Sequence, residues 1–128
     1  MKEPIWVLRE VVLIAHEQSL GEFGGAAGIR DEGLLDSALS KPENLFAYGT
    51  PSVFQLAASY GFGLVKNHPF IDGNKRIGFI VAVVFLQLNG WRLEASEVDA
   101  TLQTLALAAG ELSEAEFAEW LAAHSRPV

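Results

Sequence analysis

Three features that the 128-residue sequence lacks limit what the protein can be. It has no cysteine, which excludes disulfides and thiolate metal sites and favours a reducing compartment, the cytoplasm. It has no long hydrophobic run, because the longest, Ile77 to Leu86, stops after ten residues and predicts a buried core helix instead of a membrane span. It also lacks a signal-peptide pattern, since Glu3, Glu10 and Glu17 flank an apolar run of only five residues.

Basic residues are scarce as well. Nine lysines and arginines stand against sixteen acids, and the net charge of −7 argues against direct nucleic-acid binding. The charge is uneven, however. Residues 44–93 contain one acid, Asp72, and four bases, a net charge of +3, whereas the remainder has a net charge of −10. A local basic spot in an acidic chain suggests a specific anion site, although core segments with few charges would give the same imbalance.

Length and pattern predict one all-α domain over residues 1–128. Apolar residues recur at helical spacing, and we expect about six helices, with residues 77–86 in a central buried one. The first helix is predicted to start at Pro4, the second to run from Asp31 to a stop at Lys41-Pro42, and the third to start at Thr50-Pro51. The central helix is predicted to end at Gly90, and the next to run from Ser96 to Gly110. A capping box at Ser113–Glu116 marks the start of the last helix. The sequences LFAYG, residues 45–49, and WRLEA, residues 91–95, are the only extended candidates.

In the stretch HPFIDGNKRIGF, residues 68–79, several ionisable side chains immediately precede the apolar run that starts at Ile77. Pro69 disfavours helical geometry at the preceding residue, so we expect His68 to lie in a loop. Gly73 permits a tight junction, and Asn74, Lys75 and Arg76 then occupy the first turn of a helix. Unpaired N–H groups and these side chains would form an anion cradle, with phosphate as the expected guest.

Two further groups in the stretch suggest catalysis. Asp72 is suited to hold Mg²⁺, which takes one or two carboxylates together with phosphate oxygens. His68 can accept a proton from a hydroxyl nucleophile, because histidine is the side chain that most often acts as a general base. Each residue alone is more often structural, and we interpret His16 and His124 as ordinary packing or surface histidines. The combined spacing favours a functional site, while the Walker A and protein-kinase motifs are absent.

The sequence HPFIDGNKR resembles the signature of the Fic/Doc family, H-x-F-x-(D/E/N)-(G/A)-N-(G/K)-R. The resemblance covers nearly the whole chain, and GIRDEGLLDSALSKPENLFAYG and FQLAASYGFGLVKNHPF are similar to the death-on-curing (Doc) toxin branch. It implies a Fic-type helical fold whose central helix follows the motif loop, with ATP and Mg²⁺ at its start. Carried over by position, His68 would be the general base, Asp72 the metal ligand, Gly73 and Asn74 the anion hole, and Arg76 a phosphate ligand.

Two positions bear on the implied chemistry. Family members that transfer AMP have glycine at the position of Lys75 and a second arginine at that of Phe79, whereas Doc-type toxins carry the lysine. The resemblance therefore implies a toxin kinase acting on a Ser or Thr of a host protein, with elongation factor Tu as the first candidate. Gly73, where Doc often has alanine, keeps AMP transfer open as the alternative. A binding module without catalysis is a further alternative, although a pure binder needs neither His68 nor Asp72.

Control by a partner is also implied. The inhibitory pattern (S/T)-x-x-x-E-(G/N) of many Fic proteins is absent from the sequence, because no Ser or Thr has Glu four residues later. The Doc branch implies instead a Phd-type antitoxin that folds on binding. We expect it to dock in a groove near the motif, although the apolar residues proposed to line that groove would also suit an ordinary core. They are Leu34, Leu35, Leu45, Phe46 and Tyr48.

Overall fold

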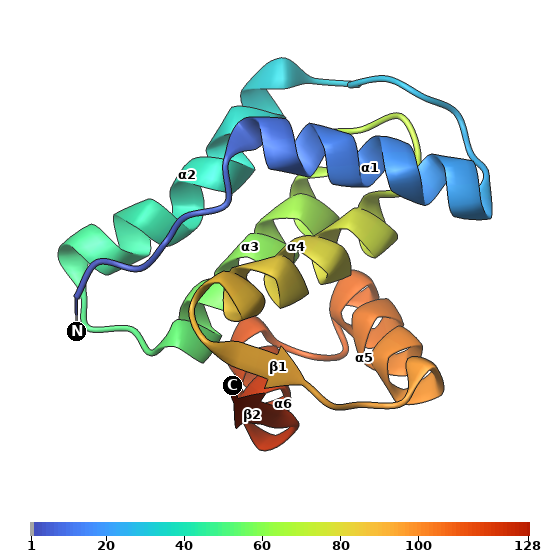
Figure 1. Ribbon diagram of the computed structural model, residues 1–128. Coiled ribbons are helices and arrows are strands. Elements are labelled where there is room, and N and C mark those ends of the chain that lie inside the picture. Colours follow the sequence, from blue (N-terminus) through green and yellow to red (C-terminus); the bar gives the residue numbers. More distant parts are fainter. Residues whose placement is uncertain (1) are drawn as a thin grey trace.

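The computed structural model describes residues 2–128, and over these residues the chain is helical, as predicted (Figure 1). The elements, in chain order, are α1 (Arg9–Phe23), α2 (Glu32–Tyr48), α3 (Val53–Asn67), α4 (Asn74–Leu88), β1 (Trp91–Leu93), α5 (Glu97–Ala109), α6 (Glu114–Ala123) and β2 (Ser125–Pro127). None of the helices in this part of the chain combines the length and the apolar character that crossing a bilayer requires.

The antiparallel pair α3 and α4 forms the centre of the fold, and the other helices surround it (Figure 1). The pair can approach closely because glycines face each other: a Cβ at Gly78 would lie 3.0 Å from the carbonyl O of Gly61 and 2.7 Å from a methyl of Val65. The α4 side chains Ile77 and Phe85 are fully buried. The loop that contains the motif, residues 68–73, thus connects the two most buried helices. The apolar run after the motif predicts the burial of α4.

Serine and aspartate caps set most helix starts, as the sequence indicates. Asp31 caps α2 through the Leu34 N–H, 2.9 Å away, and Ser96 caps α5. Ser113 forms the predicted capping box of α6, and Ser52 forms one for α3, two residues after the predicted start. Local hydrogen bonds of this kind depend on a few neighbouring residues, which is why the sequence alone locates them.

The predicted helix start at Pro4 is wrong, because residues 4–8 are not helical and α1 begins at Arg9. Distant side chains hold this segment. The Asn89 carboxamide accepts from the Ile5 N–H (2.8 Å) and donates to the Ile5 carbonyl (3.0 Å), and the Tyr60 hydroxyl accepts from the Val7 N–H (3.1 Å). These bonds satisfy backbone polar groups of the segment without a helix.

The predicted stop at Pro42 is also wrong. Pro42 lies inside α2 and is buried, and the helix continues through Leu45 to Tyr48, so the predicted extended segment LFAYG is helical up to its last residue. Two contacts hold the helix on either side of the proline. Lys41 forms an ion pair with Glu114 on α6 (2.6 Å), and the Phe46 ring packs edge-on against Trp6 with 5.8 Å between centroids. Packing therefore overrides the local preference of proline.

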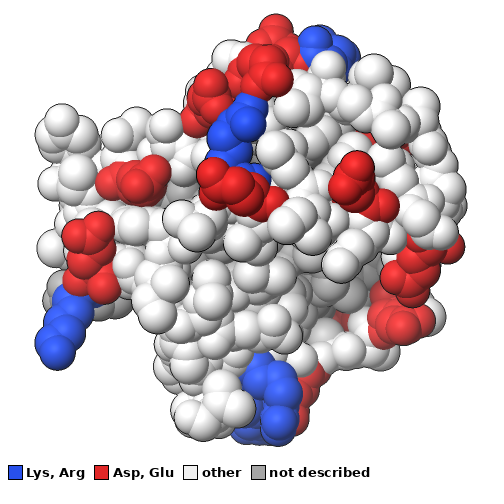
Figure 2. All heavy atoms as spheres, turned by 45° about the horizontal axis from the view of Figure 1, so that its top comes forward, with Lys and Arg blue, Asp and Glu red and all other residues white. Residues whose placement is uncertain are grey.

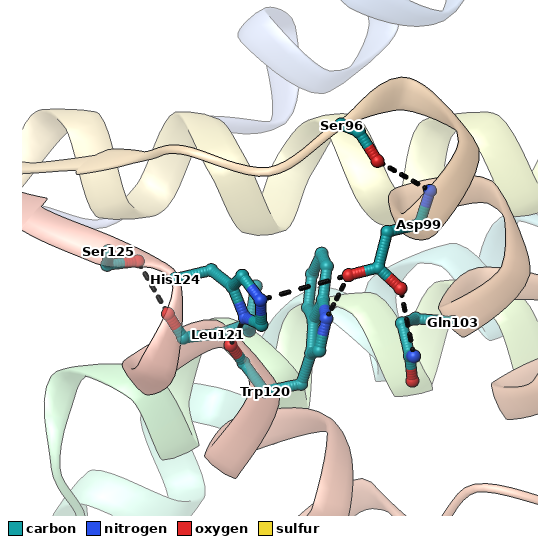
Figure 3. Close-up of polar contacts among 7 residues, drawn as sticks. All are labelled: Ser96, Asp99, Gln103, Trp120, Leu121, His124 and Ser125. Atoms are coloured by element: carbon teal, nitrogen blue, oxygen red, sulfur yellow. Dashed lines mark hydrogen bonds and ion pairs between the residues drawn. The ribbon is translucent and has the colours of Figure 1, made fainter.

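The extended candidate at 91–95 is confirmed in part. Residues 91–93 form β1, which pairs antiparallel with β2 near the C-terminus, Arg92 opposite Arg126. Figure 3 shows how Asp99 on α5 joins α6 beside this sheet. Its carboxylate accepts from the Trp120 indole N–H (2.9 Å) and lies 3.8 Å from the imidazole Nε2 of His124. His124 is therefore a packing residue, as predicted.

Candidate active site

The motif loop, residues 68–73, connects α3 to α4 and lies against the glycine-rich segment that leads from α1 to α2 (Figure 1). Ile29 forms an antiparallel bridge with Phe70, and the Ile71 N–H donates to the Gly28 carbonyl (3.0 Å). Phe70 is buried and fixes the middle of the loop, whereas His68 and Asp72 on either side of it are exposed. The loop therefore presents the candidate base and the candidate metal ligand on one short, anchored segment.

His68 lies outside the helix, as predicted, and caps the C-terminus of α3. Its backbone is left-handed, with φ 53° and ψ 52°. Its imidazole has no hydrogen-bond partner within residues 2–128 and is exposed. An unpaired imidazole at a loop surface is free to accept a proton from an incoming hydroxyl.

Asp72 is held as a carboxylate by backbone donors. Its Oδ1 accepts from the Gly73 N–H (2.9 Å), and its Oδ2 accepts from the Ala26 N–H (3.3 Å). These two bonds are the main reason that the pKa of Asp72 lies below its usual range, with smaller contributions from the nearby Arg76 and His16. An ionised, exposed carboxylate is a suitable Mg²⁺ ligand.

No group of three or more acidic or histidine side chains that could cage a metal occurs within residues 2–128. This donor set fits Mg²⁺ bound through one carboxylate, with phosphate oxygens and water completing its coordination. Asp72 would hold the ion on this basis.

The start of α4 has the character of an anion site. No side chain caps it, which is also true of α1, whereas the starts of α2, α3, α5 and α6 are capped by side chains. The first N–H with a helical acceptor is that of Ile77, which donates to the Gly73 carbonyl (3.0 Å), so the N–H groups of residues 74–76 precede the helical ladder. Gly73 has φ +77°, a conformation that suits glycine.

The side chains of the first turn divide into three roles. Asn74 is only 3% exposed, and its carboxamide bonds to both the N–H and the carbonyl of Phe70 (2.9 and 3.0 Å). Its side chain thus shapes the loop, and only its backbone N–H remains for an anion. Lys75 is exposed beside α5. Arg76 donates to the Gly24 carbonyl (2.9 Å), while its buried Nε has no partner within the described residues.

His16 supports the loop from α1, a role that sequence reasoning missed. It is 4% exposed, its ring stacks on that of Phe70 with 3.8 Å between centroids, and its Nε2–H donates to the Asp72 carbonyl (2.8 Å). The available signal was its spacing, because Val12, His16 and Ser19 share the buried face of α1. A histidine on such a face points inward.

The apolar residues expected to line an antitoxin groove do not form one surface beside the motif. Leu35 is fully buried, and Phe46 packs against Trp6. Tyr48 is 91% exposed, but it lies fourteen residues beyond Leu34 on α2, about 21 Å along a straight helix. The expectation is therefore wrong for Leu35 and Phe46, and it stays a prediction for Leu34, Leu45 and Tyr48.

The basic residues of the first turn are not part of a broad positive face. Figure 2 shows the side of the molecule that α1 crosses, with acidic groups spread over it and the visible basic groups next to acidic ones. This side of the molecule therefore carries no broad positive patch. Such a distribution suits a small anion better than a nucleic-acid duplex.

Comparison with known proteins agrees with this geometry. The family model described as Fic/DOC family matches residues 6–86, which include α1 to α4 up to Leu86 and the motif loop. A protein named Toxin Doc from Mycolicibacterium smegmatis is 41% identical over 76 residues, which are 57% of this chain and 58% of that protein. The chain thus matches somewhat more than half the length of this relative. Because the family model matches more than half of the chain, the protein belongs to the Fic/DOC family.

Proposed function

We propose that this protein is the toxin of a toxin–antitoxin pair and transfers the γ-phosphoryl group of ATP to a Ser or Thr hydroxyl of a host protein. The observation that carries the proposal is the uncapped start of α4, flanked on one loop by an unpaired imidazole and an ionised carboxylate. The name of the relative, Toxin Doc, supports the toxin assignment. Elongation factor Tu is the first candidate substrate.

In the proposed reaction, the imidazole of His68 takes the hydroxyl proton as the hydroxyl oxygen attacks the γ-phosphorus. A new P–O bond forms, the bond to the β-phosphate oxygen breaks, and ADP leaves. Asp72 would hold Mg²⁺, which neutralises phosphate charge when bound. The N–H groups of residues 74–76, with Lys75 and Arg76, bind the phosphate oxygens. His68 then releases its proton to solvent.

Lys75 and Phe79 favour phosphoryl transfer over AMP transfer. A lysine at position 75 adds a long cation to the cradle and changes where a phosphate is best held. Phe79, one turn later on α4, packs against the core and offers no charge to a terminal phosphate. Gly73 is the feature that favours the alternative, because AMP-transferring members have glycine at that position.

Transfer of separately labelled phosphates tests the proposal. The purified protein is incubated with a bacterial lysate, Mg²⁺ and ATP labelled at either the α or the γ position. Label from γ on a host protein is the expected result, and label from α would instead establish AMP transfer. His68→Ala should reduce transfer about 10²- to 10⁴-fold while leaving the fold intact. A folded wild-type protein that transfers neither label would refute both enzymatic assignments.

We further propose that a separate Phd-type antitoxin restrains the protein. Expression of the chain alone in a susceptible bacterium should stop growth, and co-expression of its genomic neighbour should restore it. His68→Ala serves as the control, because it should permit growth without the neighbour. Normal growth with wild-type protein present at a measurable level would contradict the toxin assignment.

A further inference from the structure

The backbone of His68 is in an unfavourable conformation. It is the only non-glycine residue with positive φ within residues 2–128. Left-handed geometry is disfavoured for residues with a Cβ and persists where surrounding contacts impose it. The backbone sets the direction in which the His68 side chain leaves the loop, and no hydrogen bond within the described part of the chain offsets a change in that direction.

One residue outside the motif, Arg30, contacts this backbone three times. Its guanidinium Nε–H donates to the His68 carbonyl (2.7 Å), and its Nη2–H donates to the Asn67 carbonyl (3.0 Å). Its own backbone N–H donates to the Pro69 carbonyl (2.7 Å). Three consecutive carbonyls of the chain are thus bound by a single residue, on both sides of the left-handed position.

These carbonyls have no helical donors. A continuing helix would pair the Asn67 carbonyl with the Ile71 N–H and the Pro69 carbonyl with the Gly73 N–H, but the first donates to Gly28 and the second to the Asp72 carboxylate. They also lie at the C-terminal end of α3, where a positive charge interacts favourably with the helix dipole. The two nitrogens of a planar guanidinium can bind two successive carbonyls at once, which a lysine ammonium on a flexible stem does not reproduce.

We propose that Arg30 is a positioning residue that holds the His68 backbone in the left-handed conformation and so aims the imidazole at the substrate hydroxyl. This inference rests on the proposed function for its catalytic consequence, but its conformational part is independent of activity. The anion cradle is held by other contacts, those of Asn74 and His16 with the loop. Loss of the Arg30 side chain should therefore affect the base and leave nucleotide binding intact.

The test compares Arg30→Met with Arg126→Met in the full chain. Arg126 is an exposed arginine whose partner is Glu94 beside the C-terminal strand, so its variant controls for the loss of one arginine side chain and its charge at a position away from the motif loop. Backbone ¹³C chemical shifts of His68, which depend on φ and ψ, report the conformation. Rates of γ-phosphoryl transfer at varied ATP concentration report kcat and KM. If Arg30→Met does not fold, Arg30→Lys keeps the charge and the stem and is measured in the same way.

Arg30→Met should shift the His68 resonances and lower kcat about 10- to 100-fold, the loss typical of a misplaced catalytic group, with KM for ATP within about twofold of wild type. Arg30→Lys should recover part of the loss, and Arg126→Met should match wild type. Unchanged His68 resonances in a folded Arg30→Met protein would overturn the proposal. So would a parallel change in KM and in the Asn74 resonances, because Arg30 would then support the whole loop.

The two proposals fail in different ways. If the wild-type protein transfers no label, the proposed function is wrong, and the His68 resonances alone decide the conformational role of Arg30. If the wild-type protein is active and Arg30→Met keeps its full kcat, the proposed function stands and the positioning role is wrong.

Discussion

The buried carboxamide of Asn74 leads to a prediction that separates a structural role from a ligand role. Replacing Asn74 with alanine removes an acceptor from the Phe70 N–H and a donor from the Phe70 carbonyl. Phe70 is 1% exposed, so neither backbone group gains free access to solvent. Each buried group left without a partner costs about 1–3 kcal/mol, and partial entry of water reduces the sum to about 2–4 kcal/mol.

Urea unfolding of Asn74→Ala, followed by circular dichroism, measures this loss. For a chain of this size it corresponds to a melting temperature lower by about 10 °C. Lys75→Ala is the matched control, because it alters the neighbouring exposed side chain of the same helical turn. It should leave stability unchanged or raise it by up to about 1 kcal/mol, since a base in the first turn opposes the helix dipole.

The two interpretations of Asn74 then give opposite results. If its carboxamide served mainly to bind phosphate, its removal would lower activity and leave the free energy of unfolding within about 0.5 kcal/mol of wild type, as for surface substitutions in general. That result would refute the structural role.

Three further predictions concern stability and chemistry. Burial raises the pKa of Tyr60 to about 12, and its hydroxyl accepts a buried backbone N–H, so Tyr60→Phe should lower the free energy of unfolding by about 1–2 kcal/mol; an unchanged urea midpoint would contradict this. The hydrogen bond from the indole N–H of Trp120 is the main cause of the lowered pKa of Asp99 in the folded protein. Ionised Asp99 therefore stabilises the fold at pH values above the carboxyl pKa of the unfolded chain. This contribution is lost as the pH falls through the pKa of Asp99 in the folded protein. Asp99→Asn should therefore lose less stability than wild type between neutral pH and about pH 3, and equal losses would be the opposing result. Lys75→Gly combined with Phe79→Arg should weaken γ-transfer and introduce α-label transfer, whereas a folded double variant with full γ-transfer would show that these positions do not direct the chemistry.

The parts of the fold that the sequence predicts are those decided by nearby residues. The caps at Asp31, Ser96 and Ser113 need only the following turn, and β-strand residues 91–93 follow a glycine turn with alternating side chains. The errors at Pro4 and Pro42 have a different origin. Residue Ile5 is fixed by a side chain 84 positions away, and α2 is held on either side of Pro42 by contacts with residues distant in the sequence. No local pattern contains that information.

The candidate site shows the same division. Its motif residues are contiguous, so their order alone placed His68 before the helix and the bases in its first turn. The residues that fix the geometry come from elsewhere: His16 bonds to a carbonyl 56 positions later, and Arg30 to one 38 positions later. The sequence does not indicate these pairs, because they form only when the motif loop folds against α1 and the segment that follows it. The sequence thus identifies the chemical groups, and the structure identifies what holds them.

The site also concentrates the local conflicts of the fold. His68 is left-handed, α4 begins without a side-chain cap and with two bases in its first turn, and the buried Nε of Arg76 has no partner in the described chain. Side chains cap α2, α3, α5 and α6, and α1 is the other helix of the described residues that begins without a side-chain cap, but its first turn lacks the paired bases of α4. An anion at α4 would accept from its free N–H groups and reverse the unfavourable charge of the first turn. The unfavourable features at α4 are therefore those that phosphate binding would relieve, which is the pattern expected where a sequence sacrifices local stability for function.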